Sequence, residues 1–158
     1  MIKKFNLNKS LIISILIPLF VGLVSSLLSI NSFNNFNLLN KPPLSPPGWL
    51  FPIVWTILYI LMGISSYLVY EENDVHSDCC LKIYFLSLFI NFLWSPIFFT
   101  LELRLFAFIF IVVLDLLVAY TIFFYYKVNK KAAYLQIPYL VWVLFATYLN
   151  LAIYILNR

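Results

Sequence analysis

The sequence predicts an all-α membrane protein, a five-helix transmembrane bundle that forms a single domain over residues 1–158. Composition is the first reason: 64% of the residues are hydrophobic and 10% are charged, against about a quarter charged in a typical soluble domain. The second reason is five apolar runs, each close to the roughly 20 residues that cross a bilayer as a helix. The runs cover about residues 10–30, 49–70, 82–100, 105–126 and 133–156. Apolar and polar residues do not alternate in these runs as they do in barrel strands. The runs should therefore be helices, whose backbone hydrogen bonds are made within the helix even in lipid.

The first run follows three lysines, Lys3, Lys4 and Lys9, as the apolar core of a signal peptide would. It is longer than a typical signal-peptide core, and no convincing small-residue cleavage site comes after it. We therefore expect this run to be retained as the first membrane helix.

The second run begins after the stretch KPPLSPPGW, residues 41–49, which contains two Pro-Pro pairs. Proline fixes its own backbone and pushes the preceding residue toward an extended conformation. We expect these residues to form a semi-rigid strap that ends a long, Asn-rich connection. The next connection, EENDVHSDCC at residues 71–80, is acidic, and we expect it to be solvated.

The third, fourth and fifth runs follow one another through short connections, so basic residues can be assigned to the two ends of the bundle. Lys3, Lys4, Lys9, Lys82, Lys127, Lys130 and Lys131 fall at one end, and Lys41, Arg104 and Arg158 at the other. Lysine and arginine accumulate on the cytoplasmic side of membrane proteins. We expect a cytoplasmic N-terminus and an external C-terminus, in what we take to be a bacterial cell membrane. The net charge of +4 is explained by this placement, and no nucleic-acid partner is predicted.

The single histidine, His76, forms the pattern H-x-x-C-C with Cys79 and Cys80. Adjacent cysteines lack the C-x-x-C spacing of a chelate and a fourth ligand is unclear, so we predict no metal site. One loop histidine cannot complete a catalytic triad either, and we predict no catalytic residue. A reduced, solvated loop is the favoured interpretation, and a metal or redox role is the alternative.

Asp115 lies in the middle of the fourth run, where a carboxylate is costly unless it faces the interior or has a partner. One interpretation is a proton or ligand contact, and the other is a hydrogen bond between helices. Asn91 and Asn150 also lie within apolar runs, where amides usually join helices by hydrogen bonds.

Aromatic and amide residues recur along one face of three predicted helices. The faces hold Trp55, Tyr59 and Met62; Asn91, Trp94 and Phe98; and Pro138, Trp142, Ala146 and Asn150, with Leu149 beside them. A single such face is more often plain packing. Three faces, each with a tryptophan and with small or amide neighbours, indicate a shared aromatic pocket, and Ala146 next to Trp142 leaves room for a flat guest.

Three segments in order resemble a known family. They are KPPLSPPGWLFPIVWTILYILMG at residues 41–63, NFLWSPIFF at 91–99 and IPYLVWVLFATYLN at 137–150. They are similar to the signature segments of the TspO/MBR family, the tryptophan-rich sensory proteins and mitochondrial translocator proteins. The resemblance extends over helices two to five. One departure is Leu44, which stands where the family usually has tryptophan.

The resemblance implies a receptor or sensor that binds porphyrins and similar flat hydrophobic ligands inside the bundle, with a carrier role also open. It implies no cofactor beyond porphyrin as a ligand, and it implies a homodimer surrounded by membrane lipid. The predicted ligand-binding residues are Trp55, Tyr59, Asn91, Trp94, Phe98, Trp142, Phe145, Ala146 and Leu149, and the predicted lid residues are Pro46, Pro47 and Trp49.

Two alternative functions remain open at this point. The first is an enzyme that degrades protoporphyrin IX under light, because tryptophans would lie against a photosensitiser. The second is a structural membrane protein without a selective ligand, in which the tryptophans only pack.

Overall fold

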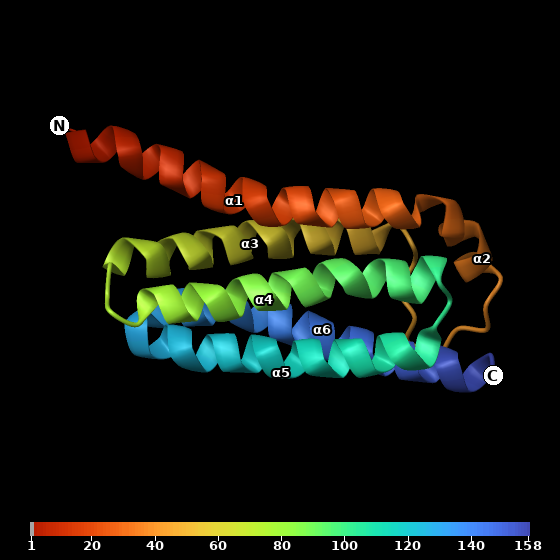
Figure 1. Cartoon of the computed structure of the whole chain (residues 1–158). Helices are drawn as coiled ribbons and strands as arrows, with labels where there is room; N and C mark the ends of the chain where they lie inside the picture. Colours follow the sequence, from red (N-terminus) through yellow and green to blue (C-terminus); the bar gives the residue numbers. More distant parts are fainter. Residues whose placement is uncertain (1) are drawn as a thin grey trace.

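The computed structural model describes the backbone of residues 2–158 and the side chains of residues 9–32 and 34–158. The described chain is all-helical, and it confirms the predicted fold class: five long apolar helices run side by side (Figure 1), each long enough to cross a membrane. Their mean hydropathy lies between 1.6 and 2.7, as expected for a multi-pass membrane protein. The elements are α1 (Ile2–Ser29), η1 (Ile30–Ser32), α2 (Phe33–Asn37), α3 (Leu50–Glu72), α4 (Ser77–Ser95), η2 (Pro96–Thr100), α5 (Arg104–Val128) and α6 (Lys130–Leu156).

The connection between α3 and α4 is shorter than hydropathy predicts. α3 ends at Glu72, and the next residue, Asn73, has the left-handed φ of 49° that is common just beyond a helix C-terminus. α4 then begins at Ser77 rather than near residue 82, because polar residues form its first turn. The Asp74 carboxylate accepts from the His76 N–H at 2.8 Å, and Ser77 Oγ donates to the Val69 carbonyl at 3.0 Å. These bonds tie the polar start of α4 to the end of α3.

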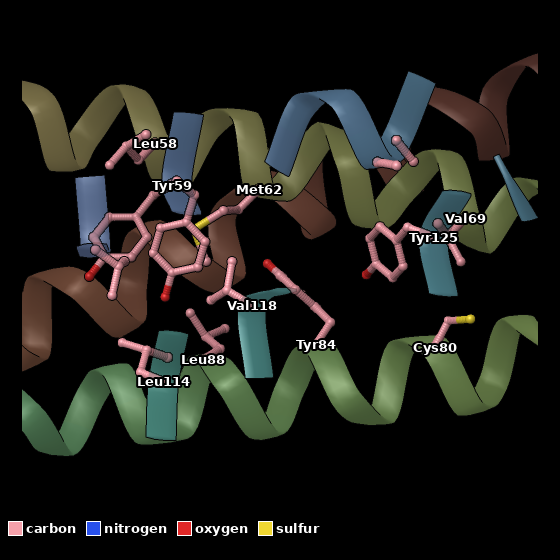
Figure 2. Packing of buried hydrophobic residues seen from close by; sticks show 14 of the residues in the cluster. Leu58, Tyr59, Met62, Val69, Cys80, Tyr84, Leu88, Leu114, Val118 and Tyr125 are labelled. Atoms are coloured by element: carbon pink, nitrogen blue, oxygen red, sulfur yellow. The ribbon is translucent and has the colours of Figure 1, made fainter. Parts of the chain in front are cut away.

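The core lies between α3, α4, α5 and α6, and large buried tyrosines are prominent in it. Tyr84, Tyr125 and Tyr139 are all at most 1% exposed. In Figure 2, Tyr125 and Cys80 lie toward one end of the cluster and Tyr59 lies toward the other, with Tyr84 between them. The ends of the bundle therefore differ, and the end at Tyr59 is the one that contains the cavity described below.

α1 packs against α3 and α4 and leaves most of its surface to the surrounding lipid. A methyl group added at Gly63 would stand 2.5 Å from the Ile15 Cα atom, so the two backbones approach closely there. Hydroxyl groups hold the other end of α1 to α4: Ser25 Oγ donates to the Phe92 carbonyl at 2.9 Å, and Ser29 Oγ lies 3.0 Å from Ser95 Oγ. α1 is thus fixed to α3 near Ile15 and to α4 near Ser25 and Ser29.

Polar bonds also join the last two helices. Thr147 Oγ1 on α6 lies 2.7 Å from Asp115 Oδ2 on α5, which is the interhelical hydrogen bond that one interpretation of Asp115 predicts. Asn150 Nδ2 donates to the Arg104 carbonyl at 2.9 Å. One amide and one hydroxyl–carboxyl pair therefore hold α5 to α6.

The long connection between α1 and α3 is partly helical and is anchored to the end of the chain. Its first part folds into η1 and α2, which the Asn-rich sequence did not reveal. The Asn157 side chain then holds the Asn40 backbone from both sides, with its Oδ1 accepting from the Asn40 N–H and its Nδ2 donating to the Asn40 carbonyl, each at 2.9 Å. We call this pair of bonds the Asn157 clamp. It fixes the connection across the end of the bundle, beside the C-terminus in Figure 1.

Candidate ligand-binding cavity

A cavity of about 650 Å³ lies at the end of the bundle that the long connection crosses. Its walls come from α1, α3, α4, η2 and α6, and from the connection itself. The lining residues are Leu19, Gly22, Leu23, Ser25, Ser26, Phe36, Asn37, Gly48, Phe51, Pro52, Trp55, Thr56, Tyr59, Asn91, Trp94, Ser95, Phe99, Trp142 and Ala146. The volume lies within the 300–1,000 Å³ that is usual for small-molecule sites.

The walls are mainly aromatic rings held in fixed positions. The rings of Trp55 and Tyr59 stack at 5.4 Å between centroids, and Phe51 meets Trp142 edge to face at 5.8 Å. The Trp94 indole is fixed differently, because its Nε1–H donates to Asn150 Oδ1 at 3.1 Å. Three tryptophans from three helices therefore offer flat surfaces to one space.

The cavity contains few polar groups, and its lining lacks ionised side chains. Among the described residues that line it, none is Asp, Glu, His, Lys or Arg. The Asn91 amide at its inner end donates to Tyr139 Oη at 3.0 Å. The Trp142 Nε1–H is buried and has no hydrogen-bond partner among the described residues. The site is therefore built for apolar stacking with a small number of neutral polar contacts.

The cavity reaches the outer surface of the bundle between α1 and α3. Leu23 and Ser26 on α1, and Pro52 and Thr56 on α3, line the cavity and are also exposed. These helices meet closely further along, where Gly22 lies against the Tyr59 ring and Gly63 lies against Ile15. Toward the end of the bundle that the long connection crosses, α1 and α3 are further apart, and this gives the cavity a side that faces the bilayer.

Six of the nine residues predicted to bind ligand lie around this cavity. They are Trp55, Tyr59, Asn91, Trp94, Trp142 and Ala146. Phe98 and Leu149 are instead buried, at 4% and 5% exposure, and Phe145 contacts the Trp142 and Tyr148 rings. These three residues do not line the cavity, and the role of all nine as ligand contacts stays a prediction.

The three predicted lid residues, Pro46, Pro47 and Trp49, flank the cavity lining without being part of it. Gly48, between Pro47 and Trp49, does line the cavity. Trp49 is 67% exposed at the start of α3, where an indole can lie at the membrane–water interface. Leu44, the departure from the family pattern, is 68% exposed and also lies outside the lining.

The sequence reasoning missed the wall formed by α1 and the cover formed by α2. Gly22, Ser25 and Ser26 are small residues in a run that is otherwise rich in Ile and Leu. This change in side-chain size was the available signal, because small residues let helices or ligands approach closely. Phe36 and Asn37 carried no comparable signal, since an Asn-rich segment is typical of an irregular connection.

The H-x-x-C-C segment lies at the opposite end of the bundle, remote from this cavity. Cys79 is exposed, and Cys80 is buried in the core cluster. Within the described part of the chain, no group of three or more His, Cys, Asp and Glu side chains is placed to hold a metal ion.

A second hollow, of about 430 Å³, lies outside the bundle near the C-terminus. Its lining includes Glu102, Arg104, Tyr154 and Arg158. Arg104 Nη2 lies 3.4 Å from a Glu102 carboxylate oxygen, so the charges in this hollow are already partly paired.

Comparison with known proteins agrees with the sequence resemblance. The family model of the TspO/MBR family matches residues 14–156. The chain is 40% identical to the tryptophan-rich protein TspO of Archaeoglobus fulgidus over 148 residues, which are 93% of this chain and 96% of that protein. It is 35% identical to the human translocator protein over 119 residues, 73% of this chain and 70% of the relative. With a family match over nearly its whole length, and with these segments folded around one aromatic cavity, the chain belongs to the TspO/MBR family.

Proposed function

We propose that the protein is a membrane receptor or sensor that binds porphyrins and similar flat hydrophobic molecules in the aromatic cavity. The observation that carries this proposal is the meeting of Trp55, Trp94 and Trp142, from three helices, around one space of about 650 Å³. Aromatic faces attract flat conjugated molecules by stacking and dispersion, and an uncharged lining suits an apolar macrocycle.

The names of the relatives are compatible with this proposal. They include a tryptophan-rich sensory protein from Cereibacter sphaeroides, at 38% identity, and translocator proteins from mammals. The family relationship supports a sensor or a carrier. The porphyrin itself is proposed from the cavity and from the sequence resemblance.

The test is a titration of the protein, purified in detergent, with protoporphyrin IX while tryptophan fluorescence is recorded. We expect saturable quenching. Ala146→Leu should weaken binding at least tenfold, because the larger side chain occupies the space beside Trp142. Trp142→Phe should weaken binding by about 0.5–1.5 kcal/mol, the usual value of an aromatic contact beyond its buried area. Unchanged affinity in both variants would overturn the proposed site.

Ala119→Leu is the matched control, because it makes the same chemical change at an exposed position on α5 outside the cavity. It should leave porphyrin binding unchanged. Melting curves of all variants show whether any loss of binding reflects loss of the fold. A bound ligand also raises the melting temperature through mass action, so a porphyrin-specific rise that a control amphiphile does not produce rejects a purely structural role.

The same sample separates a receptor from an enzyme. Under illumination with oxygen, an enzyme that degrades protoporphyrin IX would produce a new absorbing species faster than an equal concentration of free tryptophan does. We expect equal rates, since we propose binding without turnover. A faster reaction that Trp142→Phe abolishes would favour the enzyme.

We further propose that the N-terminus lies in the cytoplasm and the C-terminus outside, in a bacterial cell membrane. The termini lie at opposite ends of the bundle (Figure 1), and seven of the ten basic residues fall at the N-terminal end. We also propose the homodimer that the resemblance implies. Its test is the mass of the protein in detergent, measured by light scattering.

A further inference from the structure

We propose that Lys41 forms a carboxylate-binding subsite at the mouth of the cavity, so that the preferred ligands are flat apolar acids rather than neutral flat molecules. This inference rests on the proposed function and adds the chemical group that the ligand presents at the membrane surface.

The first argument is the absence of charge in the described lining of the cavity. A carboxylate placed among these residues would find no cation, and burying an unpaired charge costs several kcal/mol or more. An acid that binds here must therefore keep its apolar rings among the tryptophans and its carboxylate at the opening. The opening thus decides whether acids are accepted.

The second argument is the position of the Lys41 ammonium group. Its Nζ lies 4.6 Å from the centroid of the Phe36 ring and 3.4 Å from Asn37 Oδ1. Phe36 and Asn37 both line the cavity and Asn37 is also exposed, so the cavity reaches the surface beside α2 as well, and the cation lies at this second edge without being part of the wall. The cation–π contact holds the ammonium group over the edge of the opening.

The third argument is that the Lys41 backbone is held on both sides. The Asn157 clamp fixes Asn40, the residue before it, through two bonds of 2.9 Å. Pro42, the residue after it, is buried, and a following proline restricts Lys41 to extended conformations. A side chain on a fixed backbone loses less freedom when it binds a ligand. Lys41 is therefore a pre-positioned cation.

The fourth argument is that Lys41 has no acidic partner, unlike Arg104 at the same end of the bundle. Arg104 lies beside Glu102 at 3.4 Å, whereas Lys41 forms no ion pair with any described side chain. Its two contacts at the rim, an aromatic face and an amide oxygen, leave the positive charge available to an anion. Charge-assisted hydrogen bonds from an ammonium group to a carboxylate are among the stronger ones.

The experiment compares protoporphyrin IX with its dimethyl ester, which has the same rings and no carboxylate. Both dissociation constants are measured by fluorescence quenching for the wild type, Lys41→Gln and Lys131→Gln. Lys131→Gln removes the same charge at the opposite end of the bundle. We expect Lys41→Gln to weaken binding of the acid about fivefold, in the range of partly exposed ion pairs, and to leave the ester unchanged. Lys131→Gln should change neither dissociation constant.

Two further measurements sharpen the test. At about 1 M salt the Debye length falls to roughly 3 Å, so the preference of the wild type for the acid should shrink. Asn157→Ala releases the clamp and frees the Lys41 backbone. It should therefore weaken binding of the acid more than binding of the ester.

The outcomes separate this inference from the proposed function. If both ligands bind the wild type and Lys41→Gln changes neither, or weakens both equally, the carboxylate subsite is wrong while the cavity stands. If neither ligand binds the wild type, the proposed function fails and the subsite fails with it.

Discussion

Gly63 is a position where a single added methyl group should displace a whole helix. A Cβ atom there would lie 2.5 Å from Ile15 Cα, 2.7 Å from the Ser14 carbonyl oxygen and 3.0 Å from the Ile15 nitrogen. Ordinary carbon contacts are about 3.5–4.0 Å, so α1 would have to move back by about 1 Å. All three opposing atoms belong to backbone, which cannot relieve the overlap by changing a rotamer.

The magnitude follows from two opposing effects of Gly63→Ala. Alanine is a better helix former than glycine, which gains about 1 kcal/mol. Overpacking costs about 1–3 kcal/mol, and the upper end applies because the backbone of α1 must shift. We therefore expect a net loss of about 2 kcal/mol in the free energy of unfolding. A displaced α1 should also weaken porphyrin binding, because α1 forms one wall of the cavity.

The assay is unfolding of the purified protein in mixed micelles with increasing denaturing detergent. The control is Gly48→Ala, because a Cβ atom at Gly48 would meet nothing within 4 Å and its φ is not positive. Gly48→Ala should be close to neutral in stability. If Gly63→Ala is as stable as the wild type, α1 does not pack on α3 as described and the argument is refuted.

Two other predictions concern the polar contact between α5 and α6 and the orientation in the membrane. Thr147→Val should destabilise the protein by about 1–2 kcal/mol in the same unfolding assay, because Asp115 loses its hydroxyl partner. Thr147→Ser keeps the hydroxyl group and should be near neutral. Equal losses of stability in both variants would contradict this reason. Cys79 is exposed at the proposed cytoplasmic end, so an impermeant maleimide should label it only after the cells are permeabilised. In a Cys79→Ser background, Leu44→Cys should label in intact cells, and the reverse pattern would invert the proposed orientation.

Much of the fold follows from hydropathy, because a membrane helix needs a long apolar run and each run here lies within one long helix. The helix starts are less accessible to this reasoning. α4 begins in the polar sequence Ser77–Asp78, where hydrogen bonds to the preceding turn outweigh the low hydropathy. The folding of the Asn-rich connection into α2 depends on its position over the bundle, which no local pattern contains.

The candidate site was also predictable in part. Helical periodicity correctly groups Trp55 with Tyr59, and Trp142 with Ala146, because each pair is four residues apart on a regular helix. The same rule correctly placed Phe98 beside Trp94, since their rings stack at 5.3 Å between centroids, but it did not reveal that the segment Pro96–Thr100 is a π-helical turn. Its wider turn changes the register, so Phe99 lines the cavity in place of Phe98. A proline was visible there, but the type of helical turn was not.

The Asn157 clamp has a consequence for how the molecule is made. It joins positions 117 residues apart, one before the second membrane helix and one just beyond the end of the fifth. Since the chain is synthesised from its N-terminus, Asn40 emerges long before its partner. The connection over the cavity can therefore reach its final position only after the last helix has been inserted. The clamp over the binding site thus forms only once Asn157 has been synthesised, so a chain that stalls within the fifth membrane helix lacks these two bonds on the cover of the cavity.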